Sequence, residues 1–200
     1  MKLYYAPQAC SLAPHIVLRE LGLAFDPVRV DNRSKLTADG RDFLAINPKG
    51  YVAALELDNG QVLTEGPAIL QYLADLQLKA GLAPANGSWE RVRLQEMLNF
   101  ISSEVHGGMA WLFSTAIDDA VKALFRERLF KRFALLDQTL VRQDYLLGGT
   151  FGVADAYLFS VLRWTEGFAI DLQQWPGLVR FQVRIGERRS VQEALALELS

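Results

Sequence analysis

Hydrophobic residues follow a strand-like spacing in four stretches of the first 65 residues. Residues 2–5 form a short apolar run, residues 25–30 alternate between apolar and polar, and residues 52–57 and 61–63 flank the turn Asp58-Asn59-Gly60. Asparagine and glycine adopt positive φ at little cost, so the last two stretches are predicted to pair as a hairpin. The pattern therefore predicts four strands.

Helical spacing appears twice in the same region. Apolar residues recur over roughly 12–22, where Gly22 ends the pattern, and a second helix opens at Glu65-Gly66 and runs to about residue 77. With a short helix allowed in the polar stretch 32–42, the order is β-α-β-(α)-β-β-α. This order predicts an α+β domain over residues 1–77, in which helices pack on a small mixed sheet.

The remaining chain has only helical spacing. Residues 78–87 are rich in alanine, glycine and proline, and we interpret them as a linker. From Ser88 onward, hydrophobic residues recur at intervals of three and four, beginning with the run from Leu94 to Ile101. We therefore predict an all-α domain, a bundle of about five helices, over residues 88–200.

Composition narrows the classes of partner. Apolar residues make up 50% of the 200 residues, and 21 basic against 23 acidic residues leave a formal charge of −2 without long blocks of either sign. This balance does not favour binding to nucleic acid or to an anionic membrane surface. The sequence shows no window of about 18 apolar residues and no secretory signal pattern, so we expect a cytoplasmic protein without a membrane partner.

Cysteine and histidine are scarce in this chain. Cys10 is the only cysteine, which excludes an internal disulfide and fits a reducing compartment. His15 and His106 are the only histidines, and no group of histidine, cysteine and carboxylate residues has the spacing of a metal site. We expect no metal, and we interpret His15, inside the first helix, as structural.

The segment Glu65-Gly66-Pro67 places a carboxylate at the start of a predicted helix. The exposed amides of a helix N-terminus attract a ligand carboxylate, while the side chain of Glu65 attracts an ammonium group. The segment therefore suits a small ligand that carries both charges. An ordinary helix cap with proline in the first turn explains the same residues.

Three stretches together resemble the glutathione S-transferases. They are Tyr5-Ala6-Pro7-Gln8-Ala9-Cys10-Ser11-Leu12-Ala13-Pro14-His15, the segment from Asn47-Pro48-Lys49-Gly50 to Thr64-Glu65-Gly66-Pro67-Ala68-Ile69, and Phe151-Gly152-Val153-Ala154-Asp155-Ala156-Tyr157. Cys10 and His106, in their sequence context, are similar to the bacterial beta class. The resemblance implies a thioredoxin-like N-terminal domain, a helical C-terminal domain, a homodimer, and conjugation of glutathione, as co-substrate, to small hydrophobic electrophiles.

The resemblance implies that Cys10 and His106 act at the sulfur of glutathione. Conjugation needs a thiolate, because a thiol with a pKa of about 8.5 is a poor nucleophile. Cys10 precedes a helix whose first amides and dipole favour negative sulfur, and the imidazole of His106 would add a donor. The alternatives are a small buried residue for Cys10 and an ordinary helix histidine for His106.

The rest of the tripeptide would be held along its length. By resemblance, Glu65 and Gly66 receive the γ-glutamyl end, Val52 pairs its backbone with the cysteinyl unit, and Lys35, otherwise a solvated lysine, reaches the glycyl carboxylate. The expected glutathione contacts are Ala9, Ser11, Lys35, Val52, Ala53, Glu65 and Gly66, with Asn99, Ser103 and Glu104 from the helical half of the same or a second subunit. An apolar wall for the electrophile would include Tyr5, Met109, Phe113 and Trp164, although aromatic residues at helical spacing are also common in cores.

Two positions depart from the family pattern. Ala53 stands where the family has a cis proline; a cis bond costs about 2.5–4 kcal/mol before alanine against about 0.5–1 before proline. We therefore predict a trans Val52–Ala53 bond, with weakened glutathione binding and slow conjugation. Gly152 replaces the usual serine or threonine cap, and Asp155 is expected to bond back to the amide of residue 152.

Two other functions fit the same residues. In a thiol–disulfide oxidoreductase or dehalogenase-like relative, Cys10 itself attacks and forms a mixed disulfide with glutathione. In a non-catalytic relative, the same site holds hydrophobic ligands, an interpretation that Ala53 favours. Assays of the wild type and Cys10→Ala with an aryl halide and a mixed disulfide would separate the three.

Overall fold

The computed structural model describes residues 1–199, which divide into two compact units. The first unit joins residues 1–83 to the C-terminal segment that starts at Glu187, and the second unit spans residues 84–186. The sequence pattern instead groups residues 88–200 in one helical domain. The two divisions differ because the last helix packs against the first helix of the chain. No helix in residues 1–199 combines the length and apolar character needed to cross a membrane.

A four-stranded mixed sheet forms the centre of the first unit. Its order is β2-β1-β3-β4, built from β1 (Lys2–Tyr5), β2 (Asp26–Arg29), β3 (Ala54–Glu56) and β4 (Val62–Thr64). β1 pairs in parallel with β2 and antiparallel with β3, and β3 and β4 form the predicted hairpin. All four strands lie within or beside the stretches with strand-like spacing, which confirms the α+β prediction.

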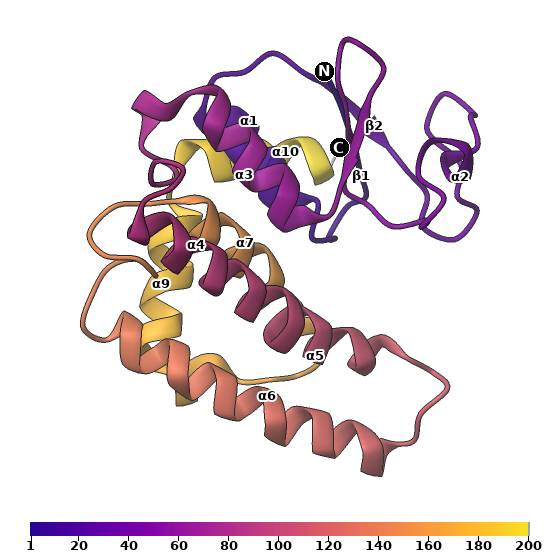
Figure 1. Ribbon diagram of the computed structural model, residues 1–200. Coiled ribbons are helices and arrows are strands. Elements are labelled where there is room, and N and C mark those ends of the chain that lie inside the picture. Colours follow the sequence, from indigo (N-terminus) through magenta and orange to yellow (C-terminus); the bar gives the residue numbers. More distant parts are fainter. Residues whose placement is uncertain (200) are drawn as a thin grey trace. The chain divides into compact units, whose positions relative to one another are not determined.

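Helices cover the sheet of the first unit. They are α1 (Leu12–Glu20), α2 (Phe43–Ile46), α3 (Gly66–Leu76), the short 3₁₀-helix η1 (Leu78–Ala80) and α10 (Arg189–Leu199). In Figure 1, α1, α3 and α10 lie together on one side of the sheet, and α2 lies on the other. α1 packs against both α3 and α10, so it is the central helix of this layer.

Apolar and polar contacts fasten α10 to α1. Val191 and Ala194 are fully buried, which accounts for the apolar part of the contact. Arg19 pairs with Glu193 at 3.4 Å, and His15, fully buried on α1, places Nδ1 3.3 Å from Oε1 of Glu198. The C-terminal segment is therefore part of the helical layer that packs with α1.

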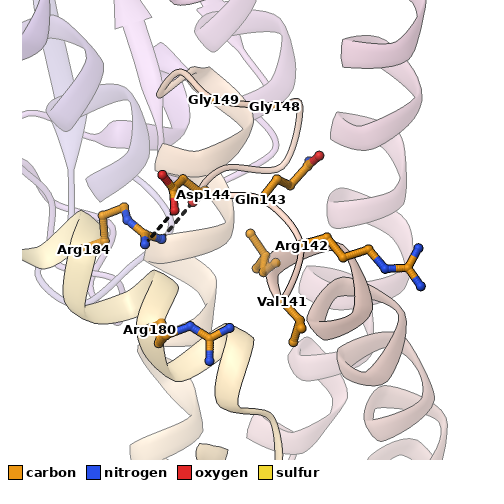
Figure 2. A pocket seen from close by; sticks show the side chains of 9 residues that line it. Val141, Arg142, Gln143, Asp144, Gly148, Gly149, Arg180 and Arg184 are labelled. Atoms are coloured by element: carbon orange, nitrogen blue, oxygen red, sulfur yellow. Dashed lines mark hydrogen bonds and ion pairs between the residues drawn. The ribbon is translucent and has the colours of Figure 1, made fainter.

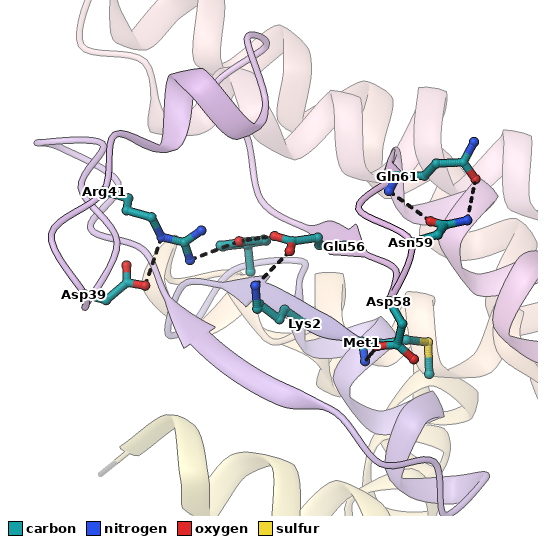
Figure 3. A network of polar contacts seen from close by, with 9 residues as sticks. Met1, Lys2, Asp39, Arg41, Glu56, Asp58, Asn59 and Gln61 are labelled. Atoms are coloured by element: carbon teal, nitrogen blue, oxygen red, sulfur yellow. Dashed lines mark hydrogen bonds and ion pairs between the residues drawn. The ribbon is translucent and has the colours of Figure 1, made fainter.

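A polar network ties a loop of the first unit to its sheet (Figure 3). Glu56 on β3 accepts hydrogen bonds from Nζ of Lys2 at 2.8 Å and from the hydroxyl of Tyr4 at 2.5 Å. Arg41 donates to the same hydroxyl at 3.2 Å and to Asp39 at 2.9 Å. The hydrogen bonds from Lys2 and Tyr4 lower the pKa of Glu56, so its carboxylate stays charged. The network holds the chain between β2 and α2 against β1.

The second unit is helical. Its helices are α4 (Trp89–Phe100), the π-helix η2 (Ile101–His106), α5 (Gly107–Ala110), η3 (Trp111–Phe113), α6 (Asp119–Leu140), α7 (Val153–Leu162), α8 (Trp164–Gly167), η4 (Leu172–Gln174) and α9 (Pro176–Gly186). α6 packs against α5 and α9, and α7, buried along its length, packs against α4 and α9. The all-α prediction is confirmed for this part of the chain.

The π-helix interrupts an otherwise continuous helix at residues 101–106. The amide of Gly107 bonds to the carbonyl oxygen of Ser102, five residues earlier. A Cβ at Gly107 would lie 3.3 Å from that oxygen, a tight contact that glycine avoids. Such single π turns often occur at functional sites, and His106 is the last residue of this one.

Asp155 anchors the start of α7. Its carboxylate, in a residue that is 2% exposed, accepts hydrogen bonds from the amides of Leu146 and Gly152, both at 2.8 Å. The bond to Gly152 confirms the predicted cap. The second bond adds a tertiary contact with the loop before the helix.

Replacing Asp155 with alanine is expected to lower the free energy of unfolding by about 3 kcal/mol, because two amides lose a charged acceptor. Urea titration followed by circular dichroism measures the change. Asp144→Ala is the matched control, since Asp144 is exposed and pairs with Arg184 at the surface; its cost should stay below about 1 kcal/mol. Equal costs for the two variants would contradict the anchoring role.

Candidate functional site

Cys10 lies two residues before the first residue of α1 and contacts the segment that leads into β3. Its Sγ donates a hydrogen bond to the carbonyl oxygen of Val52 at 3.4 Å. The side chain of Val52 belongs to a buried apolar cluster, against which Ala9 also packs. The structure therefore brings together Ala9, Cys10, Val52 and the adjoining Ala53, four of the residues predicted for one site.

The thiol of Cys10 is held in its neutral form. Burial raises its pKa to about 11, and the carboxylates of Glu65 and Glu198 act in the same direction. A hydrogen bond to its own backbone opposes these effects only in part. At neutral pH, Cys10 is therefore a hydrogen-bond donor and a poor nucleophile.

The peptide bond between Val52 and Ala53 is cis. The trans bond predicted from the sequence is therefore wrong. That prediction weighed only the local preference of the bond, whereas the loop is fixed by tertiary contacts. The side-chain amide of Asn47 donates to the carbonyl oxygen of Tyr51 at 2.7 Å. Val52 and Ala53 themselves are buried.

Glu65 stands at the N-terminus of α3, ahead of Gly66. Its φ of 72° is unusual for a residue with a side chain, and its carbonyl oxygen accepts the amides of Ala68 and Ile69, each at 3.0 Å. The exposed carboxylate pairs with Nζ of Lys49 at 2.7 Å. Exposed pairs of this kind contribute little free energy, so a ligand cation can replace Lys49.

Lys35, Ser11 and Tyr5 are engaged within the first unit. Nζ of Lys35 donates to the carbonyl oxygen of Gly50 at 2.9 Å. The hydroxyl of Ser11, a fully buried residue, bonds to both the amide and the carbonyl oxygen of Ala6, each at 3.2 Å. Tyr5 is also buried, with its ring centroid 6.0 Å from that of His15. Of these three predicted site residues, Ser11 and Tyr5 are buried and contact other residues of the first unit.

In the second unit, His106 joins an aromatic cluster. Its Nδ1 lies 2.7 Å from the hydroxyl of Tyr157, and its ring meets that of Trp164 edge-on at a centroid distance of 5.0 Å. Phe113 contacts Trp164 at 5.3 Å and Phe168 at 4.6 Å, both edge-on. Three predicted residues, His106, Phe113 and Trp164, are thus brought together.

The other predicted residues of the second unit lie on α4, η2 and α5. Asn99 is exposed, and its carbonyl oxygen accepts the hydroxyl of Ser103 at 2.9 Å. Glu104 pairs with Arg128 at 2.8 Å and Arg132 at 2.6 Å on α6, and the hydrogen bonds from these guanidinium groups lower its pKa. Met109 is fully buried. The charge of Glu104 is therefore already compensated inside this unit.

Tyr157 and Phe168 also belong to the aromatic cluster, although neither was predicted as a site residue. Tyr157 precedes Trp164 by seven residues, which is two helical turns, so the two side chains share one side of a helical segment. That spacing was a usable signal. Phe168, the C-cap residue of α8, follows Trp164 by four residues, which is also helical spacing.

A separate pocket of about 400 Å³ lies in the second unit (Figure 2). Arg184 pairs with Asp144 at 2.8 Å at its edge. The pocket is lined by Leu140, Val141, Arg142, Gln143, Asp144, Gly148, Gly149, Arg180 and Arg184, none of which was predicted for the site. Within residues 1–199, no three histidine, cysteine or acidic side chains are grouped so as to hold a metal ion.

Comparison with known proteins identifies the family. Residues 9–76 match the model of the glutathione S-transferase N-terminal domain, and residues 101–188 match that of the C-terminal domain. Glutathione S-transferase GstA of Escherichia coli O157:H7 is 44% identical over 199 residues, which cover 99% of this chain and 98% of GstA.

Solved structures agree with this result. BphK, a bacterial glutathione S-transferase in a ternary complex, is 53% identical, with a TM-score of 0.98 over 100% of both chains. A sphingomonad glutathione S-transferase in complex with glutathione has 45% identity and a TM-score of 0.96, covering 99% of this chain and 98% of its own. The beta-class enzyme of Sphingomonas chungbukensis has 44% identity and a TM-score of 0.95 with the same coverage, in line with the predicted class. The chain therefore belongs to the glutathione S-transferase family.

Proposed function

We propose that this protein is a glutathione transferase that joins the thiolate of reduced glutathione to small hydrophobic electrophiles. The contact between Sγ of Cys10 and the carbonyl oxygen of Val52 carries this proposal. It brings the residue proposed to bind the sulfur of glutathione next to the residue proposed to pair with the cysteinyl backbone, near the N-terminus of α1. The full-length relatives named glutathione S-transferases support the same reaction.

The charges of the first unit match those of glutathione. The γ-glutamyl ammonium would replace Lys49 at the carboxylate of Glu65, and the neighbouring carboxylate would meet the first amides of α3, at Gly66. Val52 would pair with the cysteinyl backbone. Lys35 would turn from the carbonyl oxygen of Gly50 to the glycyl carboxylate. Each charged group of the tripeptide thus has a partner of opposite sign.

Cys10 and His106 would stabilise the sulfur as hydrogen-bond donors. A thiol whose pKa is about 11 keeps its proton and can donate it to a thiolate. The glutathione thiol releases its proton to solvent, the sulfur forms a bond to the electrophilic carbon, and the leaving group departs with its electron pair. The raised pKa also counts against the oxidoreductase alternative, in which Cys10 attacks as a thiolate.

The remaining parts of the proposal concern the second substrate and the assembly. Phe113 and Trp164, in the aromatic cluster, would contact the apolar body of the electrophile. Asn99, Ser103 and Glu104 would add contacts from the helical unit of the same subunit or, in a homodimer, from that of the second subunit. The reduced co-substrate and the free thiol suit the cytoplasm.

Conjugation of glutathione to an aryl chloride, followed by absorbance, tests the function. We expect turnover that saturates with glutathione, and a rise in unfolding free energy of about 2.7 kcal/mol at 100 times the dissociation constant. Cys10→Ala should retain conjugation at a reduced rate. If glutathione neither stabilises the protein nor reacts, while an apolar dye binds tightly, the chain is a binding protein without this activity.

A further inference from the structure

The two histidines have hydrogen-bond partners at different ring nitrogens: Arg19 lies at Nε2 of His15, and Tyr157 lies at Nδ1 of His106. A neutral imidazole carries one proton, and the partner of one ring nitrogen determines which nitrogen holds it. His15 and His106 each have one nitrogen beside a partner of defined chemistry. The tautomer of each ring therefore follows from the nature of that partner.

Arg19 determines the tautomer of His15. Its Nε donates to Nε2 of His15 at 2.9 Å. A guanidinium group has no acceptor, so Nε2 must be the nitrogen without a proton. The proton then lies on Nδ1, which faces Oε1 of Glu198 at 3.3 Å.

Tyr157 faces the other nitrogen of its histidine. Its hydroxyl lies 2.7 Å from Nδ1 of His106, a separation typical of an O–H donor and shorter than the usual N–H···O distance. A phenol is protonated at neutral pH, because its pKa is about 10, and it donates readily to an sp² nitrogen. When the phenol donates in this contact, Nδ1 of His106 is the acceptor and the proton of the ring lies on Nε2.

We propose that Tyr157 is a positioning residue that holds His106 in its Nε2–H tautomer and so directs a donor at the sulfur of glutathione. This inference rests on the function proposed above. The other tautomer would present a lone pair to a thiolate and repel it. Trp164, edge-on at 5.0 Å, and the end of the π-helix restrain the ring itself. Tyr157 is 2% exposed, so water does not compete freely for its hydroxyl.

Nitrogen-15 NMR of protein labelled at histidine tests the tautomers directly, since protonated and unprotonated ring nitrogens have well-separated shifts. The spectra are recorded at about pH 8.5, which is two units above the ordinary pKa of free histidine. We expect the proton of His106 on Nε2 and that of His15 on Nδ1. The spectrum of His106→Gln assigns the two rings, because the chain has 2 histidines.

Tyr157→Phe then removes only the hydroxyl. We expect the signals of His106 to move toward an average of both tautomers, those of His15 to stay unchanged, and kcat/KM for conjugation to fall roughly 3- to 10-fold. Tyr145→Phe is the matched control, since the hydroxyl of Tyr145 has no hydrogen-bond partner among residues 1–199. It should change neither readout.

Two results would overturn the proposal. One is a proton on Nδ1 of His106 in the wild type, with the ring assigned through His106→Gln; this measurement needs no glutathione. The other is an unchanged tautomer or unchanged kcat/KM in a folded Tyr157→Phe protein, with folding checked by its thermal transition. Failure of the proposed function is separate, because it would show as an absence of glutathione binding by the wild type, whatever the tautomer.

Discussion

Replacing Glu65 with glutamine is expected to weaken glutathione binding about 10- to 100-fold, as measured by calorimetry. Glutamine keeps the size of the side chain and one acceptor oxygen but loses the negative charge that would pair with the γ-glutamyl ammonium. Hydrogen bonds to charged groups contribute about 1.5–3 kcal/mol, which gives this range. The carbonyl bonds of residue 65 to the first amides of α3 involve only the backbone and should remain.

Lys49→Gln provides the matched control for this prediction. Lys49 is the cation that pairs with Glu65 in the absence of a ligand, at 2.7 Å. Its removal frees the carboxylate, so affinity for glutathione should stay the same or rise. If the affinity for glutathione falls equally in both variants, the loop affects binding in a general way. Glu65 then has no specific role in binding the ammonium group.

Alkylation of Cys10 by iodoacetamide is expected to be about 300-fold slower at pH 7 than that of a free cysteine. The thiolate is the reactive form, and a pKa of about 11 instead of about 8.5 lowers its population by that factor. The rate should rise tenfold per pH unit up to about pH 11. Mass spectrometry follows the adduct without ambiguity, since Cys10 is the only cysteine.

The same shift makes stability depend on alkaline pH. Because the pKa of Cys10 is raised on folding, its contribution is complete below the unfolded value of about 8.5 and is lost as pH rises through about 11. The wild type should therefore lose about 3 kcal/mol more than Cys10→Ala between pH 8 and pH 12. Fast alkylation at pH 7, with no such difference, would instead support Cys10 as the attacking thiolate of an oxidoreductase.

Local signals were sufficient to predict the sheet of the first unit and the helices of the second. Alternation at residues 25–30 and the Asn59-Gly60 turn depend only on side chains close in sequence, and the strands β2, β3 and β4 follow them. The partner of α10 was different. Its amphipathic pattern shows that one face is buried. The contact between residues 15 and 198 could not be predicted, because neither segment alone indicates its partner.

Some features of the site could likewise be predicted from the sequence, whereas others depend on tertiary contacts. The resemblance to the family indicated Cys10 and Val52, and the structure places them in contact. The burial of Ser11 and Met109 and the compensation of Glu104 by Arg128 and Arg132 depend on tertiary packing. The cis bond before Ala53 had the same origin, because a local energy alone pointed the other way.

The attachment of α10 to α1 has a consequence for biosynthesis. Ribosomes synthesise a polypeptide from its N-terminus, so the helix that completes the sheet-containing unit is made only after the whole helical unit. The helical unit, contiguous in sequence, can finish folding while its predecessor still lacks Val191 and Ala194. A nascent chain arrested at residue 186 should consequently expose an apolar strip on α1 and recruit chaperones, whereas a chain that includes α10 should not.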